Sequence, residues 1–242
     1  MLSPETLSAL FARGDLVKIC GLRQPEHARA AAAAGADLIG FVFAPARRRV
    51  TPAVARACIT AARQVERERQ VVAVGVFVDA PVDEIEETVE AAGLDLVQLH
   101  GGEPPALVQG LRAPAIKALR SEPSATAGTL VAMIDVYRGA ARPPIAYLVD
   151  GFAAGTLGGA GAKADWSMAA AVRAERAVLL GGGLDSSNVA DAIRRVRPIG
   201  VDVSSGVERD GIKDAALIVS FVRAARQGFQ EGATSRPAQR AR

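Results

Sequence analysis

The sequence predicts an α/β protein built as a single-domain (β/α)8 barrel, the TIM-barrel fold. Short apolar runs rich in β-branched residues alternate with Ala-rich amphipathic stretches along the whole chain. Nearly continuous apolar strands that alternate with helices indicate a parallel sheet covered by helices. Eight such units fit into the 242 residues, and a barrel of this kind takes about 250 residues.

The alternative fold is an open, doubly wound sheet. That fold would place a G-x-G-x-x-G turn after its first strand. In this chain Gly21 is followed by LRQP, which lacks the spacing. The barrel is therefore favoured.

The expected elements follow the apolar pattern in order. The eight strands are the runs Val17–Cys20, Leu38–Phe43, Val71–Val78, Leu94–Leu99, Ala115–Leu119, Ile145–Val149, Ala177–Leu180 and Ile199–Val203. The eight helices between and after them cover residues 25–34, 52–68, 82–92, 103–111, 123–137, 165–173, 185–196 and 213–226. Helix-start signals support several of them, namely Pro52, Pro81, Asp165 and Asp185.

The two ends of the chain differ from the repeating units. Residues 1–15 precede the first strand, and we expect them to form a short helix on the bottom of the barrel. The barrel itself is expected to span residues 16–226. Residues 227–242 are polar and basic and contain Gly and Pro, which predicts a frayed tail. Nucleic-acid binding by its arginines is disfavoured, because no aromatic residues alternate with them as stacking platforms.

The composition excludes several classes of protein. A hydrophobic content of 50% argues against disorder. No apolar run reaches the roughly 18 residues of a bilayer span, and the start of the chain lacks a signal-peptide pattern, so we expect a cytoplasmic protein away from membranes. Two cysteines and two histidines cannot build a disulfide scaffold or an ordinary zinc cluster. The net charge of +3 suits an anionic small molecule.

Glycines follow the seventh and eighth strands, where this fold usually binds phosphate. Gly182 and Gly183 would let the backbone approach a ligand and turn its N–H groups inward. A helix predicted to start near Asp185 would add its positive end. We therefore predict a phosphate site that also includes the neighbouring loop of Ser204, Ser205 and Gly206. The alternative is that the run of glycines forms only a flexible turn.

Cys20 and Asp150 end the first and sixth strands and are the candidate base and acid. Lys18 lies on the same strand face as Cys20, and a nearby cation lowers the pKa of a thiol. Asp150 follows the apolar run IAYLV, so partial burial is expected to raise its pKa. The alternatives are that Cys20 fills the core and that Asp150 caps the next loop. Cys58 lies inside an Ala-rich helix and is expected only to pack.

Several other polar residues are expected at the same rim of the barrel. Asp202 either holds loops together or orients the phosphate site. His100, which follows Gln98 at a strand end, is either a general base or a neutral hydrogen-bonding group. One member of the run 47–49, all arginines, is expected to bind a second anionic group such as a carboxylate, unless the run is only a solvated cluster. Lys163 lies in a glycine-rich loop, a candidate lid.

These motifs, in this order, resemble the phosphoribosylanthranilate isomerase family of tryptophan biosynthesis. The combination of VKICG (17–21), VQLHG (97–101) and DVSSGVE (202–208) is specific, although each motif alone is weak. Further matches are GADLIGFVF (35–43), VGVFVD (74–79), AIKALR (115–120), LVDG (148–151), GGAGAKADWS (158–167) and LLGGGLDSSNV (179–189). The resemblance covers the chain from about residue 16 to residue 225.

The resemblance implies a cofactor-free (β/α)8 barrel that acts on a small phosphosugar. The implied reaction is an Amadori rearrangement of N-(5-phosphoribosyl)anthranilate to 1-(2-carboxyphenylamino)-1-deoxyribulose 5-phosphate. Cys20 matches the family's general base, and Asp150 matches its general acid. Nucleic acid, membranes and metal ions have no part in this chemistry. Both a monomer and a homodimer stay open, as does activity on the related aminoaldose of histidine biosynthesis.

The same resemblance assigns binding residues. Arg48 matches the arginine that contacts anthranilate, but the loop is one residue shorter than is usual in the family, so Arg47 and Arg49 stay alternatives. The remaining substrate contacts are expected from Lys18, Gln98 and His100. The phosphate is expected to bind at Gly182, Gly183, Asp202, Ser204, Ser205 and Gly206.

Other phosphosugar barrels and a non-catalytic binding barrel are the alternatives. Indole-glycerol-phosphate synthase would use a strand-end Lys and Glu. Lys18 and Lys117 qualify, but no Glu ends a strand. A ribulose-phosphate epimerase would need metal-binding His and Asp residues, which two histidines barely permit. A binding module would not require Cys20 together with Asp150.

Overall fold

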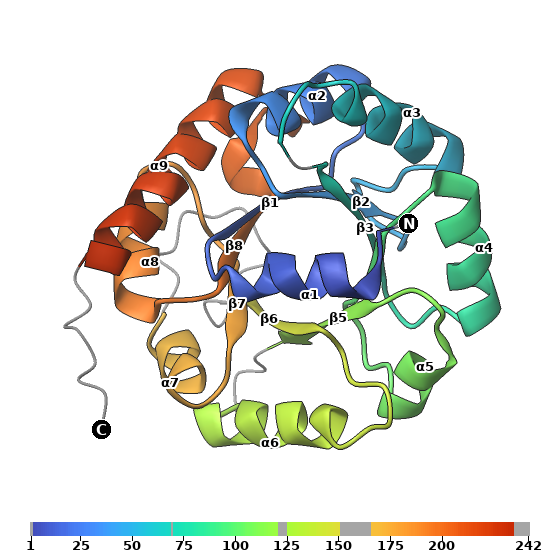
Figure 1. Cartoon of the computed structure of the whole chain (residues 1–242), viewed down its shortest axis with the longest axis vertical. Helices are drawn as coiled ribbons and strands as arrows, with labels where there is room; N and C mark the ends of the chain where they lie inside the picture. The colour runs from blue at the N-terminus through green and yellow to red at the C-terminus, as the bar shows by residue number, and fades with distance from the viewer. Residues whose placement is uncertain (1, 69, 121–124, 151–165, 235–242) are drawn as a thin grey trace.

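A computed structural model of the chain describes residues 2–68, 70–120, 125–150 and 166–234. Eight strands form a closed barrel in the order β1 to β8, and β8 pairs in parallel with β1. Figure 1 shows this barrel surrounded by helices. The predicted (β/α)8 barrel is therefore confirmed.

The strands agree with the predicted apolar runs to within a few residues. They are β1 (Leu16–Cys20), β2 (Leu38–Val42), β3 (Val72–Phe77), β4 (Leu96–Leu99), β5 (Ala115–Arg120), β6 (Ala146–Asp150), β7 (Val178–Gly181) and β8 (Gly200–Val203). The helices are α1 (Pro4–Ala12), α2 (Pro25–Ala34), α3 (Pro52–Arg63), α4 (Val82–Ala92), α5 (Pro105–Gly110), α6 (Ala127–Arg138), α7 (Ser167–Glu175), α8 (Val189–Val196) and α9 (Ala215–Thr234).

A short 3-10 turn and a small hairpin lie between β8 and α9. They are η1 (Ser205–Val207), β9 (Glu208–Arg209) and β10 (Ile212–Lys213). Strands of two residues carry no recognisable apolar alternation, so sequence reasoning did not predict the hairpin.

Helix α8 begins at Val189 rather than near Asp185. Asp185 Oδ1 accepts the N–H groups of Ser187 at 2.7 Å and Asn188 at 3.1 Å. Asn188 Oδ1 in return accepts the N–H of Asp185 at 2.9 Å. Acceptance of the N–H groups two and three residues on is the pattern of a helix N-cap, and the Val189 N–H donates to the Asp185 carbonyl at 3.0 Å. Asp185 therefore caps the turn of residues 186–188 that leads into the helix, as predicted.

The barrel interior and the helix layer form two apolar clusters, because successive residues of a strand face opposite sides of the sheet. The strand residues of the inner cluster are Leu16, Leu38, Val72, Val74, Leu96, Ile116, Ala118, Ala146, Leu148 and Leu179. Their chain neighbours, such as Val17, Ile39 and Ala73, pack under the helices. A residue two or four positions after an inner-cluster residue on the same strand faces the same side. Near the carboxyl end of the strand, such a residue therefore points into the barrel mouth.

Helix α1 lies across the bottom of the barrel (Figure 1). The Ser3 side chain caps its start by accepting the Thr6 N–H at 3.2 Å. Leu7 is fully buried and Phe11 is nearly so, and both belong to the inner cluster. The expected N-terminal helix thus closes the barrel floor.

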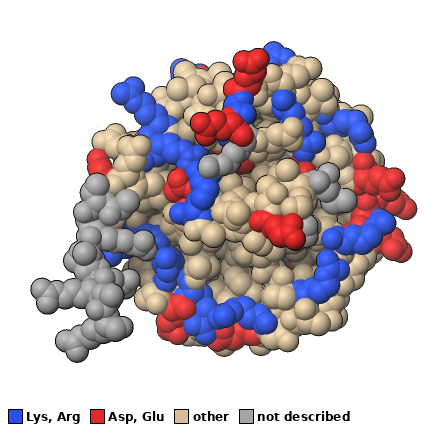
Figure 2. All heavy atoms as spheres, viewed as in Figure 1, with Lys and Arg blue, Asp and Glu red and all other residues tan. Residues whose placement is uncertain are grey.

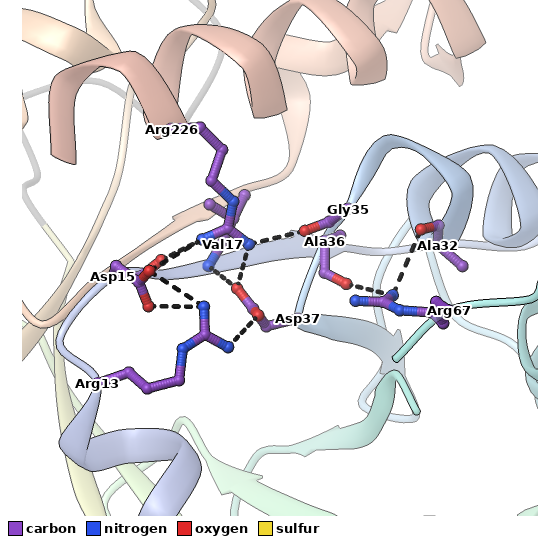
Figure 3. Close-up of polar contacts among 9 residues, drawn as sticks. All are labelled: Arg13, Asp15, Val17, Ala32, Gly35, Ala36, Asp37, Arg67 and Arg226. Carbon is purple, nitrogen blue, oxygen red and sulfur yellow. Dashed lines mark hydrogen bonds and ion pairs between the residues drawn. The ribbon is translucent and has the colours of Figure 1, made fainter. Parts of the chain in front are cut away.

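A polar cluster joins α1, β1, β2 and α9 at this same end (Figure 3). The carboxylate of Asp37 accepts the Val17 N–H at 2.9 Å, Arg13 Nη1 at 3.0 Å and Arg226 Nη2 at 2.6 Å. Arg226 Nη1 also donates to the carbonyl of Asp15. The buried Asp37 is therefore fully compensated, as a buried carboxylate must be.

Helix α9 continues to Thr234, so residues 227–234 are helical instead of frayed. A Cβ atom at Gly228 would lie 2.9 Å from the Cα of Ala190 in α8, which shows how closely the two helices pack. Arg194 Nη1 pairs with Glu231 Oε2 at 3.0 Å. These tertiary contacts are invisible in the polar local sequence. Residues 235–242 of the predicted tail lie outside the described residues.

The outer surface at the α1 end carries mixed charge. In Figure 2, Lys and Arg are interspersed with Asp and Glu on this face. Within the described ranges, no helix is both long and apolar enough to cross a bilayer.

Candidate active site

Five of the predicted site residues occupy inward-facing positions at the carboxyl ends of the strands. They are Lys18 and Cys20 on β1, Gln98 on β4, Asp150 on β6 and Asp202 on β8. Each side chain lies on the inward face of its strand. Because the strands close into a barrel, all five side chains point toward one mouth. This convergence is what the sequence predicted for the rim.

The thiol of Cys20 lies against Lys18 and Gly40. Lys18 is 1% exposed, and its Nζ donates to Asp202 Oδ1 at 3.0 Å. A Cβ atom at Gly40 would lie 2.8 Å from Cys20 Sγ and 3.2 Å from Lys18 Nζ. Glycine at this position of β2 therefore makes room for the thiol and the ammonium group.

Burial raises the pKa of the Cys20 thiol, and the neighbouring Lys18 ammonium only partly offsets that effect. Burial also opposes the charge on Lys18, but Asp202 and the neighbouring Cys20 together outweigh it and raise the pKa of Lys18. Lys18 is the cation that was predicted beside Cys20. The expectation that it lowers the pKa of Cys20 below the ordinary thiol value is wrong, because burial has the larger effect. Lys18 and Asp202 thus form an ion pair beside the buried Cys20 thiol.

Asp202 is the counter-ion of Lys18. Its carboxylate accepts the Lys18 ammonium at 3.0 Å, which supplies the counter-charge that a buried lysine needs inside the barrel. The role predicted for Asp202 at the phosphate site stays a prediction.

Asp150 faces His100 across the barrel mouth. Gln98 Nε2 lies 2.9 Å from His100 Nδ1, and His100 Nε2 lies 3.6 Å from Asp150 Oδ2. His100 therefore lies between Gln98 and Asp150, within hydrogen-bonding distance of Gln98. Its two predicted roles, a general base and a hydrogen-bonding group, both stay predictions.

The two loops expected to bind phosphate adjoin each other. Gly182 and Gly183 have φ values of 84° and 63°, the left-handed region that glycine favours. The N–H groups of Gly183 and Leu184 have no hydrogen-bond partner among the described residues. Gly206 packs so closely on the carbonyl of Leu184 that any side chain there would overlap with it. The arrangement leaves N–H groups of the β7 loop open to an anion beside the Ser204–Gly206 loop.

Lys213 supports the second of these loops, and sequence reasoning did not single it out. Its side chain is 3% exposed, and Nζ donates to the Ser204 carbonyl at 2.8 Å and to Glu208 Oε1 at 2.9 Å. Ser204 Oγ in turn donates to the Cys20 carbonyl at 3.2 Å. Burial lowers the pKa of Lys213, and the Glu208 carboxylate opposes that shift.

Arg48 is the member of the run 47–49 that lies at the mouth. A Cβ atom at Gly21, the residue after β1, would lie 2.6 Å from Arg48 Cδ. Arg47 is 61% exposed, and Arg49 lines a separate surface pocket beside α3 and α4. Of the three arginines left open, the geometry favours Arg48.

Glu208 is the buried partner of Arg48, and sequence reasoning also missed it. Arg48 Nε and Nη2 donate to its two oxygens at 2.6 and 2.7 Å. Burial opposes ionisation, but Arg48 and Lys213 hold the pKa of Glu208 down to about 2. Its place in the DVSSGVE motif was the one feature of the sequence that could have identified Glu208. Without the motif, a glutamate that follows Ser and Gly looks like part of an exposed loop.

Lys117, one of the lysines considered for the site, does not reach the barrel mouth. Lys117 occupies an outward position of β5, where Nζ donates to the Gly101 carbonyl at 2.6 Å and to Glu103 Oε2 at 2.8 Å. It is therefore no strand-end catalytic lysine of the indole-glycerol-phosphate synthase type. Lys163 and its candidate lid lie outside the described residues.

Fold and site together define a class of protein, the (β/α)8-barrel enzymes that work by acid–base chemistry at the carboxyl ends of the strands. A thiol and a carboxyl group stand there beside Arg48 and two N–H-bearing loops. Across the ranges that the structure covers, no group of three His, Cys, Asp or Glu residues is arranged to hold a metal ion.

The comparisons give the particular family. Residues 17–224 match the family described as N-(5'phosphoribosyl)anthranilate (PRA) isomerase. An N-(5'-phosphoribosyl)anthranilate isomerase from Roseiflexus sp. strain RS-1 is 46% identical over 218 residues, which cover 88% of this chain and 99% of the relative. The chain belongs to the N-(5'-phosphoribosyl)anthranilate isomerase family.

Solved structures of the family agree with the fold. The crystal structure of phosphoribosyl anthranilate isomerase from Thermotoga maritima has a TM-score of 0.74 and 34% identity, covering 88% of this chain and 98% of that one. A phosphoribosyl anthranilate isomerase in complex with reduced 1-(o-carboxyphenylamino)-1-deoxyribulose 5-phosphate has a TM-score of 0.71, 34% identity and the same coverage.

Proposed function

We propose that the chain isomerises N-(5-phosphoribosyl)anthranilate to 1-(2-carboxyphenylamino)-1-deoxyribulose 5-phosphate in tryptophan biosynthesis. The observation that carries the proposal is the placement of Cys20 on β1 and Asp150 on β6, both facing the barrel mouth. An acid and a base on opposite walls can address the two ends of a short reacting segment, as this rearrangement requires.

Asp150 acts first, as the general acid. It donates a proton to the ribose ring oxygen while the anilino nitrogen lone pair displaces that oxygen from C1′, so the ring opens to a protonated Schiff base. His100, whose Nε2 lies 3.6 Å from Asp150 Oδ2, keeps the carboxyl group turned toward the mouth.

Cys20 acts second, as the general base. Its thiolate takes the proton from C2′, the electrons of that C–H bond form the C1′=C2′ bond, and the C=N π electrons return to nitrogen. The resulting enolamine then tautomerises to the ketone product. The Lys18 ammonium beside Cys20 stabilises the thiolate that this step needs. No hydride or electron is exchanged, so the reaction requires no cofactor.

Two anchors hold the substrate across the mouth in this proposal. The phosphate binds between Gly182–Gly183 and Ser204–Gly206, where N–H groups and a glycine-lined approach are present. The anthranilate carboxylate binds to Arg48. Lys18 and Gln98 face the sugar between them from inward positions of β1 and β4.

The test measures the loss of phosphoribosylanthranilate fluorescence, with the substrate made in situ. We expect Cys20→Ala and Asp150→Ala each to lower kcat by at least about a hundredfold, the usual range for a lost acid or base. Both variants should keep their circular dichroism spectra. Cys58→Ala is the matched control, because Cys58 is buried in α3 away from the mouth. Wild-type rates in both site variants would refute the assignment.

We further propose that the enzyme works in the cytoplasm on a small phosphosugar, without nucleic acid. It acts there as a monomer or a homodimer. A solved relative from Thermotoga maritima, 33% identical to this chain, is described as a dimeric phosphoribosylanthranilate isomerase from which monomers were generated.

A further inference from the structure

We propose that Glu208 is a positioning residue that fixes Arg48 for the substrate carboxylate and, through Lys213, sets the spacing between the two anion anchors. The inference rests on the proposed function and deepens it, because it names what determines recognition of a carboxylated aryl group. Its basis is an ion cluster of Arg47, Arg48, Glu208 and Lys213, in which the buried Glu208 and Lys213 have no step in the reaction.

Glu208 is surrounded by cations. Its side chain is 5% exposed, and its oxygens accept Arg48 Nε at 2.6 Å, Arg48 Nη2 at 2.7 Å, Arg47 Nη2 at 2.9 Å and Lys213 Nζ at 2.9 Å. A bidentate Arg–carboxylate pair fixes the plane of the guanidinium as well as its position. Arg48 is therefore held in one orientation before any ligand arrives.

Glu208 binds one edge of the Arg48 guanidinium, formed by Nε and Nη2, and leaves the terminal edge available. A guanidinium has five N–H donors, and Glu208 takes those on the Nε side. Nη1 has no hydrogen-bond partner among the described residues. The terminal edge, formed by Nη1 and Nη2, can donate two parallel hydrogen bonds to a second carboxylate. Arg48 is 24% exposed, so a ligand in the mouth can reach it.

The same glutamate is linked to the phosphate loop. In the hairpin of β9 and β10, Glu208 pairs directly with Lys213, and the two-residue turn has positive φ at Asp210 (51°) and Gly211 (78°). Lys213 Nζ donates both to Glu208 and to the Ser204 carbonyl. The carboxylate anchor and the phosphate anchor are thus two ends of one rigid chain of contacts.

Removing the charge of Glu208 should therefore affect binding far more than chemistry. We expect Glu208→Gln to raise KM roughly tenfold or more while kcat stays within about threefold. It should weaken inhibition by reduced 1-(o-carboxyphenylamino)-1-deoxyribulose 5-phosphate much more than inhibition by the same compound without its carboxyl group. A merely structural residue would weaken both inhibitors alike.

A double-mutant cycle tests whether Glu208 acts through Arg48. In an Arg48→Ala background, Glu208→Gln should change KM far less than in the wild type, because only its contact with Lys213 is left to lose. The matched control is Glu86→Gln, which removes the same charge from the Glu86–Arg112 surface pair (2.6 Å) far from the mouth, and should leave both constants unchanged. If Glu208→Gln does not fold, the same cycle is run with Glu208→Asp. That variant keeps the negative charge on a side chain that is one methylene group shorter.

The outcomes separate the two proposals. A wild-type enzyme without isomerase turnover would remove the proposed function. An active wild type with an unchanged KM in Glu208→Gln, equal weakening of the two inhibitors, or full additivity with Arg48→Ala would overturn the role of Glu208 alone.

Discussion

At the scale of single residues, the reactivity of Cys20 is set by competing neighbours. Burial at the end of β1 disfavours the thiolate, while Lys18 favours it and Asp202 counters Lys18. Gly40 on the neighbouring strand makes this crowding possible, because any side chain there would collide with the thiol. Cys58 in α3 has no cation beside it among the described residues, and burial together with the Glu26 carboxylate raises its pKa to about 11.

This balance predicts the pH dependence of catalysis. Only the thiolate can take a proton, so kcat/KM should rise with pH and reach half its alkaline limit above about 8.5, the ordinary thiol pKa. In Lys18→Met the rise should move to still higher pH, because the stabilising cation is lost. The measurement is the pH–rate profile of both proteins in a Cys58→Ala background, and coincident profiles would contradict the role of Lys18.

At the scale of elements, α1 packs into the barrel although it lies before the region that matches the family. The family match begins at residue 17, after this helix. Leu7 and Phe11 nevertheless belong to the same apolar cluster as the inward residues of the strands, and Arg13 reaches Asp37 at the start of β2. The helix is therefore part of the barrel core rather than an appendage.

Truncation of its buried face should destabilise the whole barrel. We expect Phe11→Ala to lower the free energy of unfolding by about 3 kcal/mol, the usual cost of emptying a buried aromatic site. Ser8→Ala, on the exposed face of the same helix, should change it by less than about 0.5 kcal/mol. Urea denaturation compares the two, and equal stabilities would show that α1 does not support the barrel. Isomerase activity of the folded Phe11→Ala protein should persist, because the mouth lies at the opposite end.

At the scale of the whole molecule, the ion cluster at the mouth links stability to pH. The pKa of Glu208, about 2 in the folded protein, lies below the value of about 4.3 expected for an unfolded chain. A depressed folded pKa contributes stability that is complete above the unfolded pKa and is lost as the pH falls through the folded one. The contribution is of the order of 3 kcal/mol.

Glu208→Gln should consequently flatten the acid limb of the stability curve. The free energy of unfolding of the wild type should fall between about pH 5 and pH 2, and the variant should lose less over the same interval. Chemical denaturation at a series of pH values makes the comparison. Parallel curves for the two proteins would mean that Glu208 titrates normally in the fold.

Much of the molecule was predictable from local pattern. The eight apolar runs and their alternation with helices marked every barrel strand. Cys20, Asp150 and Asp202 could be placed at the mouth because they lie at the carboxyl ends of predicted strands. Local pattern failed where distant contacts decide the outcome. Residues 227–234 look like a tail but form helix against α8, and Lys117 looks like a rim lysine but faces Glu103 outside the barrel.

The sequence by itself determined the fold and singled out the candidate acid and base and the loops proposed for phosphate, because strand periodicity and glycine conformation are encoded in neighbouring residues. Only the tertiary structure decided which arginine faces the mouth, that Asp202 serves Lys18, and that burial outweighs the cation beside Cys20. Arg48 and Glu208 stand 160 residues apart in the chain. Their contact exists because the closed barrel brings the loop after β2 against the hairpin after β8, and no local pattern records that closure.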